Sequence, residues 1–243
     1  SHMSSSAVFG NVKQQDCPIQ DDPDNLWPIE IYGQSKSDGE QFVKDEMARA
    51  DGLSCSIIRP RTIIGTERLG IFQILFEWIS EDRDVYIIGN GKNQFQFAHV
   101  SDLVEVSIET ACRQQSGIYN IGTDRYGSLR EALETLCEKV GSKSKVRSIP
   151  TTGAIGSLWL LDKLRLSPLA PWHYMTYHKP YYFDLGTPFK DLEWRPKYSN
   201  DEMLEIGYKW YLANKASLES RDSKSTHRST MKQGALKILK WLS

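Results

Sequence analysis

The sequence contains no apolar run that approaches the roughly 20 residues a membrane-spanning helix requires. It also has no excess of charge of one sign, because 30 basic residues are balanced by 31 acidic ones, which leaves a formal net charge of -1. This balance excludes a globally basic surface, so we expect no nucleic-acid partner. No basic stretch leads into an apolar one near Met3, and no secretory signal is therefore predicted.

Cysteine is scarce, and the few cysteines lie far apart. Cys17, Cys55, Cys112 and Cys137 form no C-x-x-C pair and have no histidine at ligand spacing. We therefore predict no metal site. Isolated cysteines of this kind are typical of a reducing compartment, where they pack as small apolar residues, so we expect a cytoplasmic protein.

Short apolar runs alternate with amphipathic segments along the chain, and this alternation is typical of an α/β fold. Strands are expected over the apolar runs, namely Met3–Phe9, Cys55–Arg59, Val85–Ile88 and Ile118–Ile121. Helices are expected over the amphipathic segments, namely Ser35–Ala50, Ile71–Ile79, Asp102–Cys112 and Ser128–Val140.

Local signals indicate how several of these helices begin and which side they bury. Ser128 and Glu131 have the spacing of a capping box, and Asp102 is the expected N-cap of its helix. The segment Gly153–Gly156 is typical of a loop that leads into a helix. The apolar side expected for the helix Ser35–Ala50 consists of Phe42, Val43 and Met47.

The sharpest chemical signal is Tyr32-Gly33-Gln34-Ser35-Lys36, at the start of a predicted helix. A spacing of four residues places Tyr32 and Lys36 one turn apart on the same helical face. An ammonium group beside a phenol favours the phenolate, which makes Tyr32 a candidate general base or acid for interconverting an alcohol and a ketone. The pair alone is a weak signal, because a solvated helix face explains most such pairs.

Further motifs flank this pair in a definite order. They are Ser4-Ser5-Ser6-Ala7-Val8-Phe9-Gly10 before it and, after it, Ile58-Arg59-Pro60-Arg61-Thr62-Ile63-Ile64-Gly65, Phe97-Ala98-His99-Val100-Ser101-Asp102-Leu103, Tyr119-Asn120-Ile121-Gly122 and Leu192-Glu193-Trp194-Arg195-Pro196. Over residues 4–212 this series resembles the extended short-chain dehydrogenase/reductases, the NAD-dependent epimerase/dehydratase family. The resemblance implies a Rossmann-like parallel sheet with a smaller C-terminal substrate-binding lobe.

The resemblance also implies a catalytic set. Ser5 lies five residues before Gly10, the position of the family's catalytic serine or threonine, and Ser6 is the alternative. Tyr32 is the expected proton-transfer residue. Lys36 is expected to assist Tyr32 and to hold the nicotinamide ribose of NAD or NADP, so both residues are counted as cofactor-binding as well as catalytic.

The resemblance implies that the segment Pro60–Thr62 lines the nicotinamide and the substrate. Pro60 and Thr62 are expected to contact the cofactor, and Arg61 and Thr62 the substrate, together with Ser5 and Ser6. His99 stands at a predicted strand-to-helix junction, where a structural role is the more common one.

Departures from the family pattern narrow the implied reaction. Ser6 and Ala7 stand where the family's dehydratases carry an Asp-Glu pair, and Ala7 also replaces the cysteine of its 3,5-epimerases. A 4-epimerase or a plain dehydrogenase/reductase remains. Phe95 replaces an arginine that commonly meets the substrate diphosphate, and Arg61 and Arg68 are the residues expected to compensate. A sugar nucleotide is the expected substrate.

The glycine-rich loop that holds a dinucleotide between the first strand and the first helix of this fold is not found. By resemblance, Met3 falls at the strand of the catalytic serine, so the strands before it are missing. We expect an incomplete Rossmann-like sheet formed by residues 1–66 and 97–125. The substrate-binding lobe is expected to comprise residues 67–96 and 126–213.

An incomplete parallel sheet exposes an edge and apolar faces. We therefore expect this chain alone to bind NAD weakly or not at all, to be inactive alone, and to associate as a homo-oligomer. An engineered truncation, a shortened reading frame and a separate chain that supplies the missing half are all open explanations. The alternative is a non-catalytic binding or regulatory protein that keeps the fold.

Residues 214–243 form a basic tail. A linker rich in Ser, Lys and Arg is expected up to Gly234, followed by a short amphipathic helix over Ala235–Leu242. Residues 232–243 are one candidate for peripheral contact with an anionic membrane. Packing of this helix on its own domain or on a partner chain is favoured over that contact.

Overall fold

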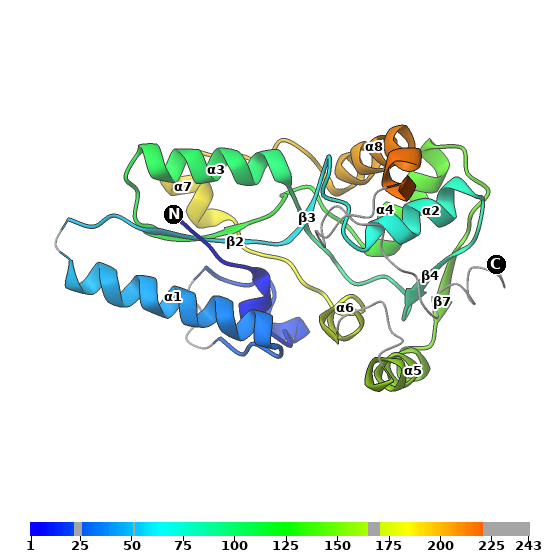
Figure 1. Cartoon of the computed structure of the whole chain (residues 1–243), viewed down its shortest axis with the longest axis horizontal. Helices are drawn as coiled ribbons and strands as arrows, with labels where there is room; N and C mark the ends of the chain where they lie inside the picture. The colour runs from blue at the N-terminus through cyan, green and yellow to red at the C-terminus, as the bar shows by residue number, and fades with distance from the viewer. Residues whose placement is uncertain (22–25, 51, 165–170, 221–243) are drawn as a thin grey trace.

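The computed structural model describes residues 1–21, 26–50, 52–164 and 171–220. A parallel sheet with a helix on each face lies at one end of the molecule, and a mainly helical lobe lies at the other (Figure 1). The tail helix predicted over Ala235–Leu242 lies outside the described residues. Within the described ranges, none of the helices combines the length and the apolar character needed to cross a bilayer.

The sheet is parallel and buried. Its strands, in spatial order, are β1 (His2–Met3), β2 (Ser56–Pro60) and β6 (Gly117–Ile121). α1 (Ile31–Arg49) covers one face of the sheet, and α3 (Val100–Cys112) lies with the short helix α7 (Gly186–Asp191) over the other (Figure 1). Ile58 in β2 pairs with Met3 on one side and Tyr119 on the other. Every residue of β2 is buried, as expected for a parallel strand covered on both faces.

β1 is the edge of this sheet. β1 pairs with β2 along one of its two sides. The Ser4 amide continues that pairing by donating to the Ile58 carbonyl at 2.8 Å. No other strand in the described ranges pairs with β1. The structure therefore shows the incomplete Rossmann-like sheet that the sequence predicts.

The remaining elements build the lobe and its connections. The other strands form two parallel pairs, β3 (Thr62–Ile64) with β5 (Phe97–His99) and β4 (Val85–Ile88) with β7 (Val146–Ile149). The other α-helices are α2 (Phe72–Ser80), α4 (Leu129–Lys139), α5 (Thr151–Lys163), α6 (Pro171–Thr176) and α8 (Asn200–Ser220). Two 3-10 helices, η1 (Ser6–Phe9) and η2 (Gln14–Asp16), follow β1.

Aromatic side chains from α2, β5 and α8 fill the core of the lobe. Phe72 meets Phe97 edge to face at 5.1 Å between ring centroids, and Phe76 meets Tyr208 at 5.7 Å. Edge-to-face contacts of this kind add about 0.5–1.5 kcal/mol each to the free energy of area burial. This packing fixes α2 and α8 against the pair β3–β5, which leads directly out of the sheet.

A buried ion pair joins α1 to the sheet. The side chains of Arg59 in β2 and Glu40 in α1 are 0% and 1% exposed, and Nη2 and Nε of Arg59 lie 2.5 and 2.8 Å from the two carboxylate oxygens. The Ser4 hydroxyl also donates to Glu40, and Arg59 donates to the carbonyl of Asp21. A buried pair needs such extra hydrogen bonds to offset the cost of removing both charges from water.

Several predicted elements are confirmed. β4 has the predicted bounds, and α2 covers the predicted segment within one residue at each end. The capping box is present, because the Ser128 side chain accepts from the Glu131 amide and Glu131 accepts from the Ser128 amide.

The strand predicted over Met3–Phe9 is wrong beyond Met3. The Ser5 hydroxyl accepts a hydrogen bond from the Ala7 amide at 3.2 Å, which caps η1 and turns the chain out of the sheet. Gly10, with φ of 61°, ends the turn.

The apolar side predicted for α1 is confirmed only in part. The helix begins at Ile31 and buries Gly33 and Glu40; Val43 and Met47 are half-buried, whereas Phe42 is 66% exposed. The buried carboxylate of Glu40 therefore shares one face of α1 with the half-buried Val43 and Met47.

Three further corrections concern helix ends. His99 caps α3 in place of Asp102, whose carboxylate is buried and accepts from the Lys197 amide at 3.2 Å. The segment Gly153–Gly156 lies inside α5 and not in a loop before it. The linker predicted from residue 214 is wrong up to Ser220, because α8 continues and buries Leu218 in the core.

Removal of the buried carboxylate should destabilise the fold far more than removal of an exposed one. We predict that Glu40→Ala lowers the free energy of unfolding by about 3–5 kcal/mol, because Arg59 is left as an uncompensated buried charge. The matched control is Glu46→Ala on the same helix, since its partner Arg49 is exposed and an exposed pair contributes under about 1 kcal/mol. Urea denaturation measures both; equal effects would contradict the role given to Glu40.

Candidate active site

The first turn of α1 carries the tyrosine–lysine pair. Glu30 is the N-cap in an extended conformation, so Tyr32 and Lys36 lie on successive turns. The Lys36 ammonium nitrogen is 5.9 Å from the centre of the Tyr32 ring, and it donates to the carbonyl of Met3 at 2.9 Å. Tyr32 is 56% exposed. The ammonium of Lys36 thus lies near the ring of Tyr32, and Lys36 links this turn of α1 to the end of β1.

Gly33 allows this turn to press against the segment that follows β1. A Cβ atom on Gly33 would lie 2.6 Å from the Ala7 carbonyl oxygen and 3.0 Å from Cβ of Pro28. Any side chain would therefore push α1 away from η1. Since Ser5 caps η1, the same contact holds α1 beside the segment that carries the Ser5 hydroxyl.

Ser6 is held from two sides. Its hydroxyl accepts from Nη1 of Arg61 at 3.2 Å, and its carbonyl accepts from the Tyr181 hydroxyl at 2.7 Å. Ser6, Arg61 and Tyr181 are all buried. The segment next to Ser5 is thus fixed by side chains from the β2–β3 connection and from the lobe.

Arg61 lies among aromatic rings instead of carboxylates. Its guanidinium carbon is 4.0 Å from the ring centre of Tyr181 and 4.7 Å from that of Phe95. Burial lowers the pKa of Arg61 to about 10. Nε of Arg61 has no hydrogen-bond partner among the described residues, so one N–H of this cation is still unused. Phe95, which replaces the family's arginine, is a core residue.

The residues predicted to contact the cofactor, Pro60 and Thr62, lie where β2 ends and β3 begins. Pro60 is the last residue of β2, and Thr62 begins β3. Thr62 is hydrogen-bonded to the side chain of Tyr177, whose pKa burial raises to about 12. Arg68 is partly exposed, on the turn in which its amide donates to the Gly65 carbonyl at 3.1 Å.

His99 and Asp102 belong to the packing around α3. Nδ1 of His99 accepts from the Ser101 amide at 3.3 Å, and its ring lies 4.2 Å from that of Tyr198. Burial lowers the pKa of His99 and raises that of Asp102 to about 6. These contacts give His99 a structural position, as the sequence suggested.

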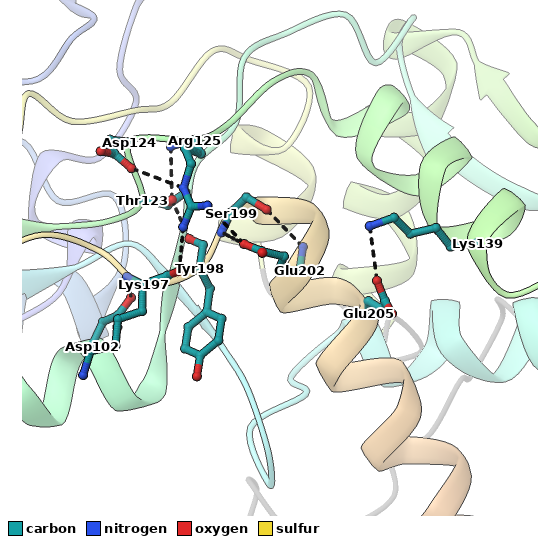
Figure 2. A network of polar contacts seen from close by, with 10 residues as sticks. All are labelled: Asp102, Thr123, Asp124, Arg125, Lys139, Lys197, Tyr198, Ser199, Glu202 and Glu205. Carbon is teal, nitrogen blue, oxygen red and sulfur yellow. Dashed lines mark hydrogen bonds and ion pairs between the residues drawn. The ribbon is translucent and has the colours of Figure 1, made fainter.

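A polar network ties this region to the lobe (Figure 2). Asp102 accepts from the Lys197 amide, and the Thr123 hydroxyl donates to the Tyr198 carbonyl at 2.6 Å. Arg125 lies 3.5 Å from Glu202 on the first turn of α8. The network thereby joins α3 and the end of β6 to the helix that anchors the lobe.

Sequence reasoning missed two residues of this neighbourhood. Glu40 follows Lys36 by four residues, as Lys36 follows Tyr32, so all three lie on one face of α1. That spacing is a signal which could have identified Glu40. Tyr181 comes from a distant part of the chain and has no signal of this kind.

A comparison with models of known protein families identifies the family to which the chain belongs. A model of the NAD dependent epimerase/dehydratase family matches residues 1–122. The chain belongs to this family. The match covers β1, α1, β2, α3 and β6, and therefore every residue predicted from the resemblance to take part in catalysis or cofactor binding.

The relatives are longer than this chain. An uncharacterized protein of Sinorhizobium fredii, y4nG, is 38% identical over 238 residues, which are 98% of this chain and 59% of the relative. A probable UDP-arabinose 4-epimerase of Arabidopsis thaliana is 26% identical over 209 residues, 75% of this chain and 45% of that protein. The chain thus spans about half the length of these relatives.

Solved structures of epimerases share the fold. The UDP-glucuronic acid 4-epimerase of Bacillus cereus, crystallised with NAD, superposes with a TM-score of 0.66 at 18% identity. The superposition covers 87% of this chain and 60% of the other. At this identity the match supports the common fold and no more.

Replacement of glycine by alanine should change the stability of the protein in opposite directions at Gly33 and at Gly153. We predict that Gly33→Ala lowers the free energy of unfolding by about 1–3 kcal/mol, because the added Cβ meets the Ala7 carbonyl. Gly153→Ala should raise it by about 0.5–1 kcal/mol, since nothing lies within 4 Å of an added Cβ and alanine favours a helix. Urea denaturation compares the two; a Gly33→Ala protein as stable as the parent would show that α1 does not press on η1.

Proposed function

We propose that this chain carries the catalytic and substrate-binding part of an NAD-dependent sugar-nucleotide 4-epimerase or oxidoreductase. The observation that carries the proposal is the position of Lys36, whose ammonium lies beside the Tyr32 ring and is bonded to Met3, two residues before Ser5. Membership of the epimerase/dehydratase family supports the same chemistry.

In this proposal Tyr32 removes the proton from a secondary alcohol of the sugar as the carbon–oxygen bond becomes a carbonyl. The positive charge on Lys36 stabilises the negative charge on the phenol oxygen, and the Ser5 hydroxyl bonds the substrate oxygen. Bound NAD or NADP supplies the hydride acceptor for such an oxidation. In a 4-epimerisation, Tyr32 would give the proton back to the same oxygen when the carbon is reduced again on its other face.

The chain's residues fit only the nicotinamide end of this cofactor. Lys36 has three N–H groups and uses one on Met3, which leaves donors for ribose hydroxyls. Pro60 and Thr62 follow the end of β2, beside the same site. No glycine-rich loop is present in the sequence for the pyrophosphate.

We propose that the substrate contacts are Ser5, Ser6, Arg61, Thr62 and Arg68. Arg68 is partly exposed and offers a guanidinium to a diphosphate. The unused Nε–H of Arg61 supports a contact to a substrate oxygen. The UDP-sugar names of the relatives support a nucleotide sugar as the substrate class.

The open edge of the sheet indicates that a further part of the Rossmann fold completes the enzyme. Met3 in β1 and Val104 and Ile108 in α3 are exposed apolar residues, and Ser1 contacts Thr110 of α3 at this edge. We propose that a glycine-rich half, from the same or another chain, covers them. Without it, the edge favours association of this chain with its own copies.

NAD titration tests the dependence on that half. We predict that the chain alone shows no binding at micromolar NAD, because the pyrophosphate lacks its cradle of amides. A protein in which a glycine-rich half from a family member is joined ahead of Ser4 should bind. Calorimetry measures both, and micromolar binding by the monomeric chain alone would contradict the proposal.

The joined protein also tests the catalytic assignment. We predict that Tyr32→Phe lowers kcat for C4 epimerisation of a UDP-sugar by about 100-fold or more, with little change in KM, because proton transfer is lost. Gln41→Ala, an exposed change on the same helix, is the control. Full activity of the Tyr32→Phe protein would overturn the assignment.

A non-catalytic binding or regulatory protein is the second candidate function. The absence of a glycine-rich loop is the observation that favours it. UDP-sugar binding by the joined protein without any hydride transfer would support this alternative.

A further inference from the structure

Two arginines at the end of β2 are buried, and only one of them has a counter-ion. Arg59 is 0% exposed and pairs with the carboxylate of Glu40. Arg61, two residues later, is 2% exposed and forms no ion pair with a carboxylate among the described residues. Cations are almost never fully buried in proteins without an anionic partner. Arg61 therefore carries a positive charge that the described part of the chain leaves unpaired.

The groups around Arg61 do not supply the missing negative charge. The ionisable groups that act on its charge are the phenols of Tyr181 and Tyr177 and the thiol of Cys17. Burial raises the pKa of each of these three groups, so all of them are neutral at pH 7. The guanidinium also lies on the rings of Tyr181 and Phe95, but aromatic rings offset only part of the cost of removing a cation from water.

The hydrogen bonds of Arg61 lead to the same conclusion. Its Nε has no partner among the residues that the structure describes, so one N–H group is unused. Its Nη1 donates to the Ser6 hydroxyl at 3.2 Å. A hydroxyl that accepts one hydrogen bond can still donate its own proton, and a cation behind it strengthens that donation. Arg61 and Ser6, which we call the Arg61–Ser6 pair, therefore suit an oxyanion.

The Arg61–Ser6 pair lies next to the proposed reaction site. Ser6 follows Ser5, whose hydroxyl bonds the reacting oxygen of the substrate in the proposed function. Ser5 and Thr62 flank the pair in the sequence and are partly exposed, whereas Ser6 and Arg61 are buried. A group that binds the pair must therefore enter past Ser5 and Thr62, close to the reacting oxygen.

A sugar nucleotide offers two kinds of oxyanion, its diphosphate and, where the sugar is a uronic acid, a carboxylate. The diphosphate is attached at C1, across the ring from C4, whereas the carboxylate is bonded to C5, next to C4. Because Ser5 holds the oxygen on C4 in the proposed 4-epimerase, the neighbouring Ser6 is placed for a group on an adjacent carbon. The partly exposed Arg68 is the residue proposed for the diphosphate. The position of the Arg61–Ser6 pair therefore favours the carboxylate.

We propose that the substrate is the nucleotide of a uronic acid, and that the Arg61–Ser6 pair binds its carboxylate. This inference rests on the proposed function, because that function places the C4 oxygen at Ser5. The carboxylate supplies the negative charge that Arg61 lacks, and the Ser6 hydroxyl donates to one of its oxygens. The pair thereby selects an acidic sugar over a neutral one and fixes the orientation of C4.

Calorimetry of the full chain tests this selection, with UDP, UDP-glucose and UDP-glucuronic acid as the probes. UDP-glucuronic acid should bind about 10-fold or more tightly than UDP-glucose, because a hydrogen bond to a charged group contributes a factor of that size. Arg61→Met should abolish this preference, and Arg61→Lys, which keeps the charge, should retain part of it. The matched control Arg68→Met should weaken the binding of all three probes by a similar factor.

Urea denaturation provides a second measurement that does not depend on binding. Because Arg61 is an unpaired buried charge, Arg61→Met should leave the urea midpoint unchanged or raise it. Arg59→Met should lower the midpoint, since Glu40 then becomes the unpaired group. A midpoint that Arg61→Met lowers as much as Arg59→Met does would show that the charge of Arg61 is already compensated within the chain, and would overturn the proposal.

The binding results separate this proposal from the proposed function. If UDP-glucose binds as tightly as UDP-glucuronic acid, the carboxylate assignment is overturned while the nucleotide-sugar site stands. An equal loss of affinity for all three probes in Arg61→Met would overturn it as well and would assign Arg61 to the diphosphate. Failure of every probe to bind would contradict the proposed substrate-binding role of the chain, and this proposal with it.

Discussion

The candidate site depends on the buried ion pair between Glu40 and Arg59. The pair joins β2 to the face of α1 that also carries the half-buried Val43 and Met47. Ser4 shares the same carboxylate, so β1, β2 and α1 are joined at one point. Once that point is fixed, Lys36 reaches the Met3 carbonyl one turn earlier on the helix, and Tyr32 lies one turn before it.

A second constraint acts at the start of η1. Arg61 and Tyr181 hold Ser6 by its side chain and its backbone, and both come from parts of the chain outside β1 and α1. The Ser5 segment is therefore fixed by the sheet, by α1 and by the lobe together. Such preorganisation is what proton transfer requires, since a displaced hydroxyl or phenol loses its geometry with the reacting carbon.

The sequence predicts the elements whose determinants are local. The period of apolar residues locates β4 and α2, and the Ser128–Glu131 pair locates the start of α4. The spacing of Tyr32 and Lys36 predicts their proximity for the same reason. Ser5, in contrast, follows a strand pattern but caps a 3-10 helix, because a short-range hydrogen bond to Ala7 overrides the pattern.

Tertiary contacts explain the remaining differences. Phe42 looks like a core residue in the sequence and is exposed, because the orientation of α1 is set by a charge in a strand nineteen residues from Glu40. The burial of Arg61 among Phe95 and Tyr181 likewise depends on segments that only the fold brings together. Neither could be deduced from periodicity.

A double-mutant cycle between Glu40→Leu and Arg59→Met tests the central interaction most directly. If the pair holds α1 on the sheet, each single variant leaves a buried charge and the double variant recovers most of the lost stability. The account predicts a coupling energy above about 2 kcal/mol in the free energy of unfolding. A coupling energy below about 0.5 kcal/mol, the level found for independent sites, would contradict it.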